Sequence, residues 1–479
     1  MLKHYCLLLL CITGNCRYTM AQENVSKTIQ FFGAKGDGKT NDTEAFIKAT
    51  KFFNDRGGNG TLNIPKGTYI VGRQTFSNGD ANKYAYTGVD ILDFKNINNL
   101  IIKGEKGTII KYDDSLKLGS FDPLTGKVFN DNDLVRPLIK YAAVIGNCII
   151  LTNCKNVTIT KLFLDGNNKS IQFGGRYGDL GIQLMHVGIY TKDCHSILID
   201  DINASHFGLD GVMISNKPSA TPDDIRLSNT ICEYNCRQGL SWVGGNSLVA
   251  KNCQFNHTGK IGYYSAPGAG VDIESEVGSI SNGFFTDCQF IDNSGCGMVS
   301  DGGSVISNCN FSNCTFWGTT NWSVWVSSPS FTFFGCKIYG SIVHGFNAVN
   351  DKDATRYINC FFEDKPYNNK PPYGKFIIEC DGPRKMLFDS CTFTTNTTQV
   401  AWLNTGGVSS EAEKATIRNC HFIINKTVNG KAVFWFHNIH FKNNTVEFKD
   451  PSAKEKGFWS NPCCLSKEDR DATKIIYSE

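Results

Sequence analysis

Asn252-Cys253-Gln254-Phe255 and Asp287-Cys288-Gln289-Phe290 are two copies of one short motif, Asn/Asp-Cys-x-aromatic, and this motif decides the fold. A cysteine with an aromatic residue two places on returns after Asn308, Asn313, Asn359, Ser390 and Asn419, and Gly335-Cys336-Lys337-Ile338 is a looser copy. Cysteines 314, 336 and 360 are separated by 22 and 24 residues, and cysteines 360, 391 and 420 by 31 and 29. Periods of about 20 to 50 residues are typical of repeat proteins. We therefore expect a solenoid whose coils each carry three short strands, with extra residues looping out between them.

Stacking of such coils gives each residue of the motif a structural role. Equivalent residues of neighbouring coils lie about 4.8 Å apart, so the cysteines form one ladder and the Asn or Asp residues before them another. The chain has no Cys-x-x-Cys pair to suggest zinc. The motif therefore predicts turns and core packing rather than a metal site.

Composition narrows the function classes. The chain has 479 residues, charged residues make up 19% of them, and the net charge is +3. It contains no long basic or acidic run, which argues against nucleic acid or an anionic membrane as a partner. Glycine (47) is plentiful, proline (13) is scarce and aromatic residues reach 12%, a mixture that favours short strands and tight turns.

Residues 1–21 are typical of an export signal. Lys3 and His4 give a basic start, residues 5–12 an apolar core too short to span a bilayer, and Thr19-Met20-Ala21 a cleavage site. The mature chain would begin at Gln22 and be secreted or periplasmic. Cys11 or Cys16 could instead carry a lipid anchor on an outer surface, although the residues before them fit a lipobox poorly. No later segment is long and apolar enough to cross a membrane.

The third strand of each coil predicts the functional site. The runs GVMIS (211–215), GLSWV (239–243), GVDIE (270–274) and GMVSD (297–301) align on their glycines. Strict alternation then turns Val271 and Ile273 inward and Asp272 and Glu274 outward. Asp301 lies one coil from Glu274, at about 5 Å backbone spacing. We take Asp272, Glu274 and Asp301 as the candidate catalytic residues, against the alternative that they are solvated strand residues.

Residues just before these strands are candidate substrate-binding groups. They are His206, Asp210, Arg237 and Gln238, together with Tyr263 and Tyr264 in the long turn Gly259–Gly270. Aromatic rings near carboxylates are what a sugar site needs for stacking and proton transfer. The structural alternatives are that Arg237 only pairs with Glu233 or Asp210 and that His206 is a turn residue. Trp242 should point inward, whereas Trp322 and Trp325 could extend a sugar site.

Two chemistries fit this set. In glycoside hydrolysis, one carboxylic acid protonates the leaving oxygen while another acts as nucleophile or base, and no cofactor is needed. In uronate β-elimination or epimerisation, a cation or arginine neutralises the substrate carboxylate and a base removes the adjacent proton. A carboxylate trio could then hold Ca²⁺, with Arg237 beside it. A non-catalytic glycan-binding or adhesive solenoid is the alternative from another class.

The opening of the mature chain adds a family resemblance. Residues 28–72, TIQFFGAKGDGKTNDTEAFIKATKFFNDRGGNGTLNIPKGTYIVG, combine a glycine-rich turn, a helix capped by Asn41 or Asp42 and a strand interrupted at Pro65-Lys66-Gly67. This segment resembles the N-terminal cap of the pectate-lyase-like superfamily, in its rhamnogalacturonase/epimerase-like branch. The resemblance implies a single-stranded right-handed parallel β-helix, an all-β fold with an N-terminal capping helix, and action on a polysaccharide or oligosaccharide.

The resemblance does not extend to the best-known hydrolases of that fold. Polygalacturonases carry Asn-Thr-Asp, Asp-Asp, Gly-His-Gly and Arg-Ile-Lys in successive positions. Here only Asp210-Gly211 matches the first, and Arg237-Gln238 stands where Asp-Asp is required. We therefore expect one β-helix domain over residues 22–450 that cleaves a polysaccharide, with hydrolysis ahead of elimination. Residues 74–96 and 113–140 should be loops walling its groove, and residues 451–479 a polar end region.

Overall fold

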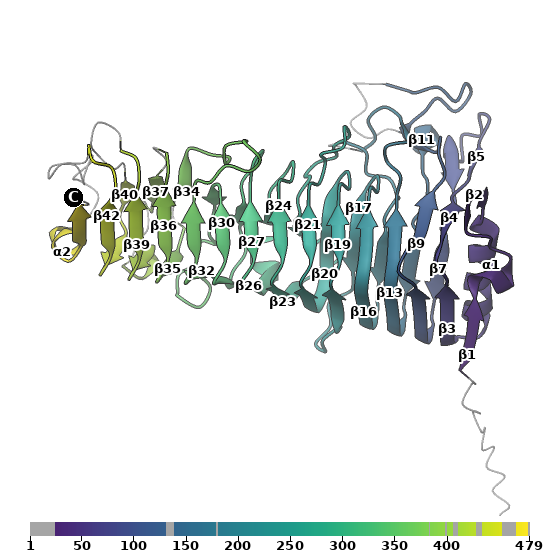
Figure 1. Ribbon diagram of the computed structural model, residues 1–479, viewed down its shortest axis with the longest axis horizontal. Coiled ribbons are helices and arrows are strands. Elements are labelled where there is room, and N and C mark those ends of the chain that lie inside the picture. Colours follow the sequence, from purple (N-terminus) through teal and green to yellow (C-terminus); the bar gives the residue numbers. More distant parts are fainter. Residues whose placement is uncertain are drawn as a thin grey trace, which may run out of the picture.

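The structure is a computed structural model that describes residues 24–130, 138–178, 181–382, 384–397, 400–405, 411–427, 434–452 and 466–477. Its strands stack side by side along one long axis, from helix α1 (Thr43–Asp55) at one end to helix α2 (Lys467–Asp471) at the other (Figure 1). Within these residues, no helix is both long and apolar enough to cross a membrane. The predicted signal, residues 1–21, lies outside the described residues.

Each coil of the solenoid carries three strands, as the repeats predict. In one coil these are β23 (Ile280–Thr286), β24 (Gln289–Ile291) and β25 (Met298–Ser300), and they pair in parallel with β26 (Ile306–Ser312), β27 (Thr315–Trp317) and β28 (Val324–Val326) of the next. The coils that follow are formed by β29 (Phe331–Phe334), β30 (Lys337–Tyr339), β31 (Ile342–Val343), β32 (Thr355–Ile358), β33 (Phe361–Glu363), β34 (Phe376–Asp381), β35 (Met386–Asp389), β36 (Thr392–Thr395), β37 (Val400–Asn404), β38 (Thr416–Arg418), β39 (His421–Ile424), β40 (Trp435–His437), β41 (His440–Lys442) and β42 (Thr445–Phe448).

The coils before β23 follow the same plan, although some of their strands run through a corner. The N-terminal coils are formed by β1 (Val25–Thr28), β2 (Asp37–Asn41), β3 (Gly58–Ile64), β4 (Gly67–Val71), β7 (Leu92–Lys95), β8 (Asn98–Gly104), β9 (Thr108–Tyr112), β12 (Ile149–Thr152), β13 (Lys155–Asp165), β15 (Ile189–Lys192), β16 (His195–Ser205), β17 (Asp210–Ser215), β18 (Ile225–Ser228), β19 (Ile231–Glu233), β20 (Gln238–Lys251), β21 (Gln254–Asn256) and β22 (Val271–Ile273).

The Asn/Asp-Cys-x-aromatic motif marks the corner between the first and second strands. Asn252, Asp287, Asn313 and Asn359 all have a positive φ, between 52° and 55°. Asn and Asp tolerate this left-handed conformation better than most residues, which explains their use there. Asn308-Cys309 is the exception, because it lies within β26 and Cys309 pairs with Gly283 of the preceding coil. That copy is therefore not a corner, and the prediction that placed it with the others was wrong.

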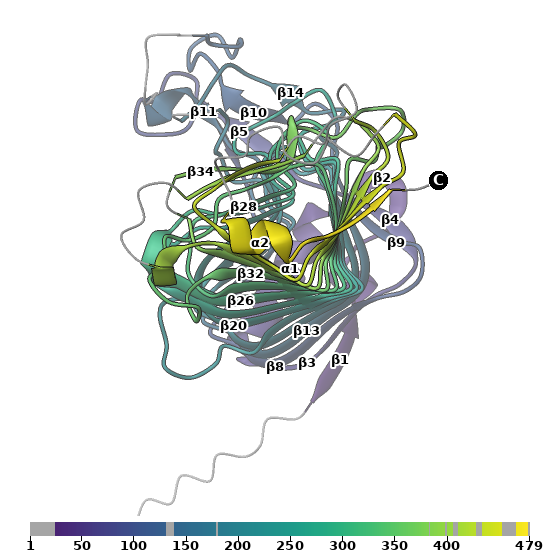
Figure 2. The same cartoon turned by 90° about the vertical axis from the view of Figure 1, so that its left-hand side faces the viewer.

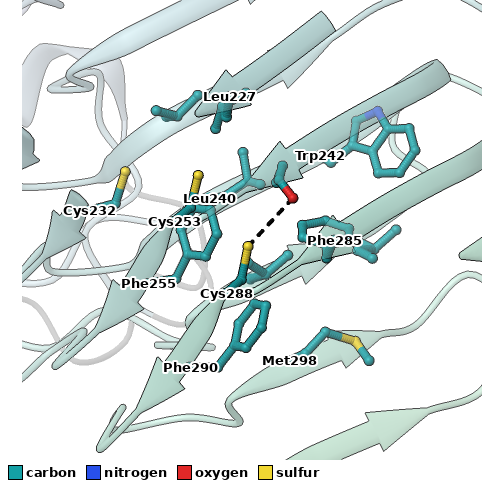
Figure 3. Close-up of a cluster of buried hydrophobic side chains, with 14 of the residues drawn as sticks. Leu227, Cys232, Leu240, Trp242, Cys253, Phe255, Phe285, Cys288, Phe290 and Met298 are labelled. Carbon is teal, nitrogen blue, oxygen red and sulfur yellow. Dashed lines mark hydrogen bonds between the residues drawn. The ribbon is translucent and has the colours of Figure 1, made fainter. Parts of the chain in front are cut away.

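Inside the corner the cysteines and aromatic rings form the core (Figure 3). Phe290 stacks on Phe316 with ring centroids 4.5 Å apart, and Phe285 stacks on Phe311 at 4.7 Å in a second, parallel column. The thiol of Cys288 donates to the carbonyl of Ala250 at 3.5 Å. Aromatic columns of this kind bury large apolar areas and pack in offset stacks, so they stabilise the coil stacking.

The cysteines of the described residues are all buried and free of disulfides. Most of them, including Cys253 and Cys288 of the motif, belong to the main hydrophobic core, where a free cysteine packs as a small apolar side chain. This confirms the interpretation of the motif as packing; Cys463 and Cys464 lie outside the described residues.

Helix α1 closes the N-terminal end. Its buried face consists of Ala45, Phe46, Ala49 and Phe53, as expected, and the side chain of Asn41 accepts a hydrogen bond from the Thr43 N–H at 3.1 Å. Asp42 instead accepts hydrogen bonds from the N–H groups of Lys35 and Gly36, so it holds the glycine-rich turn against the helix.

The loops expected at residues 74–96 and 113–140 are more regular than predicted. Three short strands from this region, β5 (Gln74–Phe76), β6 (Tyr86–Gly88) and β10 (Lys117–Ser120), form a small separate sheet with β11 (Ala142–Ala143) and β14 (Gln172–Phe173), and this sheet projects beside the solenoid (Figure 2). Residues 92–95 belong to the solenoid itself, as β7. At the other end, β43 (Lys474–Tyr477) pairs in parallel with β42, so the described part of the end region 451–479 contains a further solenoid strand.

Candidate functional site

The candidate site lies on the outer face of the third strands, where the sequence alignment placed it. Leu240, Val271 and Met298 are register partners on the inner side, and Ser241, Asp272 and Val299 on the outer side. Val271 and Ile273 are fully buried in the core, and Trp242 points into it as expected. The register predicted from the glycines is therefore confirmed.

Asp272 is directed outward but is not a surface residue. Only 6% of it is exposed, because the neighbouring outer positions Ser241, Met213 and Val243 are themselves buried. The alternative of a solvated strand residue therefore does not hold for Asp272. Met213 and Val243 belong to a small second apolar cluster. The carboxyl group consequently sits in a largely dry environment.

A single amide orients the Asp272 carboxyl. The Nε2 group of Gln238 donates to Oδ2 of Asp272 at 2.7 Å, while Oε1 of Gln238 accepts the Ala269 N–H at 2.8 Å. The second contact fixes which end of the amide faces Asp272. Among the residues that the structure describes, the hydrogen bond from Gln238 to Oδ2 is the one that the Asp272 carboxyl accepts, which leaves Oδ1 for a ligand.

The surroundings of Asp272 favour its protonated form. The pKa of Asp272 is raised to about 8, mainly by burial and next by the negative charge of Glu274. The positive charge of Arg237 lowers the pKa, but by less than Glu274 raises it. A carboxyl group with a pKa near 8 carries its proton at neutral pH and can act as an acid.

Asp210 and Arg237 form a buried ion pair beside it. Nε and Nη2 of Arg237 donate to the two oxygens of Asp210 at 2.9 and 2.5 Å, and the Ser241 hydroxyl donates to Oδ2 at 2.9 Å. Asp210 is fully buried, and the Arg237 side chain is 12% exposed. The pair is bidentate and supported by a third donor, so it is a rigid part of the site wall.

Glu274 and Asp301 follow directly after β22 and β25, and both are exposed. Loss of hydration raises the pKa of Glu274, and the charges of Glu276 and Asp301 raise it further. The hydroxyl of Ser327 donates to Oδ1 of Asp301 at 3.2 Å. The predicted trio therefore forms one electrostatically coupled group with Glu276, a fourth carboxylate that the sequence analysis passed over.

Two of the other predicted binding residues have structural partners instead. Nδ1 of His206 lies 2.9 Å from Oδ1 of Asp165, and its ring stacks on Tyr234. Tyr263 stacks on Phe173 of β14 at 4.0 Å and donates its hydroxyl to the Gly174 carbonyl. His206 is thus a turn residue, as the structural alternative held. Tyr263 connects the loop before β22 to β14 of the small five-stranded sheet beside the solenoid.

Tyr264 remains available at the surface. It is 48% exposed and its hydroxyl donates to the Pro267 carbonyl at 3.3 Å.

Among the described residues, no group of three or more His, Cys, Asp or Glu side chains has a geometry that could hold a metal ion.

The family comparison agrees with the architecture that the strand pairings show. Residues 147–332 match the family described as "Right handed beta helix region". The chain is a right-handed parallel β-helix. The matched residues contain all four aligned third strands, and this confirms the fold that the opening segment implied through its resemblance to the pectate-lyase-like superfamily.

Two curated relatives and one solved structure resemble this β-helix. The Bacillus subtilis protein YclG is 24% identical over 252 residues, 51% of the chain and 37% of the relative. An exopolygalacturonase from Arabidopsis thaliana is 27% identical over 209 residues, 37% of the chain and 46% of the relative. The A-module of the Azotobacter vinelandii mannuronan C-5 epimerase AlgE6 is 14% identical, with a TM-score of 0.42 over 94% of this chain and 99% of that one. The chain thus spans less than half the length of these two relatives.

The two tryptophans that could extend a sugar site lie in a cluster of aromatic rings on this β-helix. Trp325 is the register partner of Val299, and its ring lies beside those of Trp322 and His344. Tyr373 lies against Trp322. The sequence pattern indicated only the two tryptophans. His344 and Tyr373 belong to later coils, and no local motif links them to Asp272.

Proposed function

We propose that the β-helix is a glycoside hydrolase that cleaves a polysaccharide, with Asp272 as the proton donor. One observation carries this proposal: a nearly buried carboxyl group, held by an amide and poised to keep its proton at neutral pH, lies beside an exposed second carboxylate. The name of the plant relative, an exopolygalacturonase, supports the substrate class.

The chemistry needs two carboxyl groups in opposite states. Asp272 gives its proton to the glycosidic oxygen as the bond between that oxygen and the anomeric carbon breaks. Glu274 supplies the second carboxylate, as the nucleophile or as the base that takes a proton from the attacking water. Because like charges raise each other's pKa, ionisation of the more exposed Glu274 keeps the buried Asp272 protonated. If the first product retains the anomeric configuration, Glu274 is the nucleophile, and if the configuration is inverted, Glu274 is the base.

Arg237 favours hydrolysis over elimination. In elimination a cation or an arginine neutralises the substrate carboxylate, and two donor groups of Arg237 are already engaged by Asp210. In our scheme Arg237 and Gln238 are positioning residues, Asp301 adds negative charge near the developing positive sugar, and no cofactor is required.

The test is incubation with a panel of neutral and uronic-acid polysaccharides, with and without a chelator. We expect new reducing ends without ultraviolet-absorbing unsaturated products, insensitive to the chelator. Asp272→Asn should lose at least about 100-fold in rate, since acid catalysis contributes about 10²–10⁴-fold. Asp224→Asn is the matched control, because Asp224 lies outside the site and its left-handed backbone tolerates Asn. Unsaturated products, or a chelator-sensitive reaction, would replace the proposal by elimination. Binding without cleavage would establish a glycan-binding module.

Action on a polysaccharide also fits export, which we propose from residues 1–21. N-terminal analysis of the mature protein distinguishes its two forms. A start at Gln22 indicates cleavage and secretion, and a lipid-modified cysteine indicates anchoring.

A further inference from the structure

An aromatic patch continues the outer face beyond Asp272. It consists of Trp322, Trp325, His344 and Tyr373, with Trp322 and Trp325 centred 5.1 Å apart, Trp325 and His344 4.0 Å apart, and Trp322 and Tyr373 5.7 Å apart. Tyr373 is 37% exposed, and the other three side chains are half-buried.

The strand register fixes the place of this patch relative to Asp272. Asp272 pairs with Val299, and Val299 pairs with Trp325, so the three lie in one row on the same face. Two strand spacings separate Trp325 from Asp272 by about 10 Å. A sugar chain that lies along this row with one glycosidic bond at Asp272 therefore has another ring over Trp325.

Several polar donors in this region have no acceptor. The indole N–H groups of Trp322 and Trp325 and the Nε–H of Arg384 make no hydrogen bond. Arg384 also has no ion-pair partner among the described residues. Its positive charge acts on His344, whose pKa is lowered by burial and by Arg384. Unpaired donors cost about 1–3 kcal/mol each when buried. This neighbourhood is therefore costly in stability, which is typical of functional sites.

We propose that the aromatic patch and Arg384 form a subsite for one sugar ring of the substrate. A sugar combines an apolar C–H face, which stacks on aromatic rings, with a rim of oxygen acceptors. The half-buried rings of Trp322 and Trp325 and the exposed ring of Tyr373 contact the C–H face of the sugar, and the guanidinium group of Arg384 binds a hydroxyl or a carboxylate of that ring. The subsite rests on the proposed function for its substrate, and it predicts that recognition depends on chain length.

The test measures binding rather than turnover, using galacturonic-acid and glucose oligosaccharides of two to eight units and isothermal titration calorimetry. We expect Trp325→Ala to weaken binding of the longer oligosaccharides at least 10-fold and to leave the disaccharides unchanged. Phe334→Ala, which truncates a 47% exposed ring on another face of the coil, is the matched control and should bind as the wild type does.

Arg384→Gln separates the two sources of the acceptor. Loss of binding only for galacturonic-acid chains assigns Arg384 to a carboxylate, and loss for both series assigns it to a hydroxyl. The proposal is overturned if Trp325→Ala binds long chains like the wild type, or if it loses all lengths equally. Wild-type binding without cleavage would overturn the hydrolase while leaving the subsite in place.

Discussion

At the scale of single residues, the site depends on how dry one carboxyl group is. Asp272 and Glu274 are two positions apart on the chain, yet Asp272 is 6% exposed and Glu274 is exposed. Burial, rather than sequence spacing, therefore divides the proposed roles of acid and base between them.

This division predicts the pH dependence of activity. Because the general acid must carry its proton, the rate should fall as the pH rises through the Asp272 pKa of about 8. A pH–rate profile with the best substrate checks it. A descending limb well below pH 6 would mean that Asp272 ionises normally and is not the acid.

Stability should respond to the same group. The unfolded chain loses the Asp272 proton near pH 3.8, whereas the folded protein keeps it to about pH 8. The wild type therefore loses stability between these pH values, and Asp272→Asn does not. We expect the urea midpoint of the variant to rise relative to the wild type from pH 5 to pH 9. A constant difference between the two proteins would contradict the raised pKa.

At the scale of elements, each strand divides its residues between the core and the surface. On β23, Phe285 is fully buried in the aromatic column and the adjacent Phe284 is 41% exposed. Both residues are phenylalanines, and they differ only in burial. Comparing their truncations therefore measures how much the aromatic column contributes to the free energy of unfolding.

Truncation of the two rings should have unequal effects. We expect Phe285→Ala to lower the free energy of unfolding by about 3–5 kcal/mol, since it leaves a cavity between stacked rings. Phe284→Ala should change it by no more than about 0.5 kcal/mol. Denaturant titration of both variants measures this, and equal losses would show that the column is not the stabilising feature.

At the scale of the whole molecule, a solenoid has two ends where coil stacking stops. The N-terminal end is covered by α1 through Phe46, Ala49 and Phe53, all fully buried. Without a cover, the apolar interior and unpaired strand edge of the first coil would be open to another chain.

Disruption of this cover should cause association. Phe46→Asp places a charge under the helix, so we expect larger, concentration-dependent species in size-exclusion chromatography with light scattering. Phe31→Asp is the control, because Phe31 is 61% exposed beside the same helix. An unchanged elution volume for Phe46→Asp would show that α1 is not needed as a cap.

The sequence by itself determined the architecture of this protein. The burial, the ion pairing and the neighbours of the residues in its candidate site were decided only by the tertiary structure. Left-handed corners at Asn252 or Asp287, inward cysteines and alternation through Val271 and Ile273 are local requirements, so they leave a repeating trace in the chain. For the same reason the glycine alignment gave the correct row of Ser241, Asp272 and Val299. Three features of the site depend on segments from different coils: the burial of Asp272, the closed pair of Asp210 and Arg237, and the packing of His344 on Trp325 and of Tyr373 on Trp322. Such contacts form between residues far apart in the chain, and no periodicity in the sequence records them.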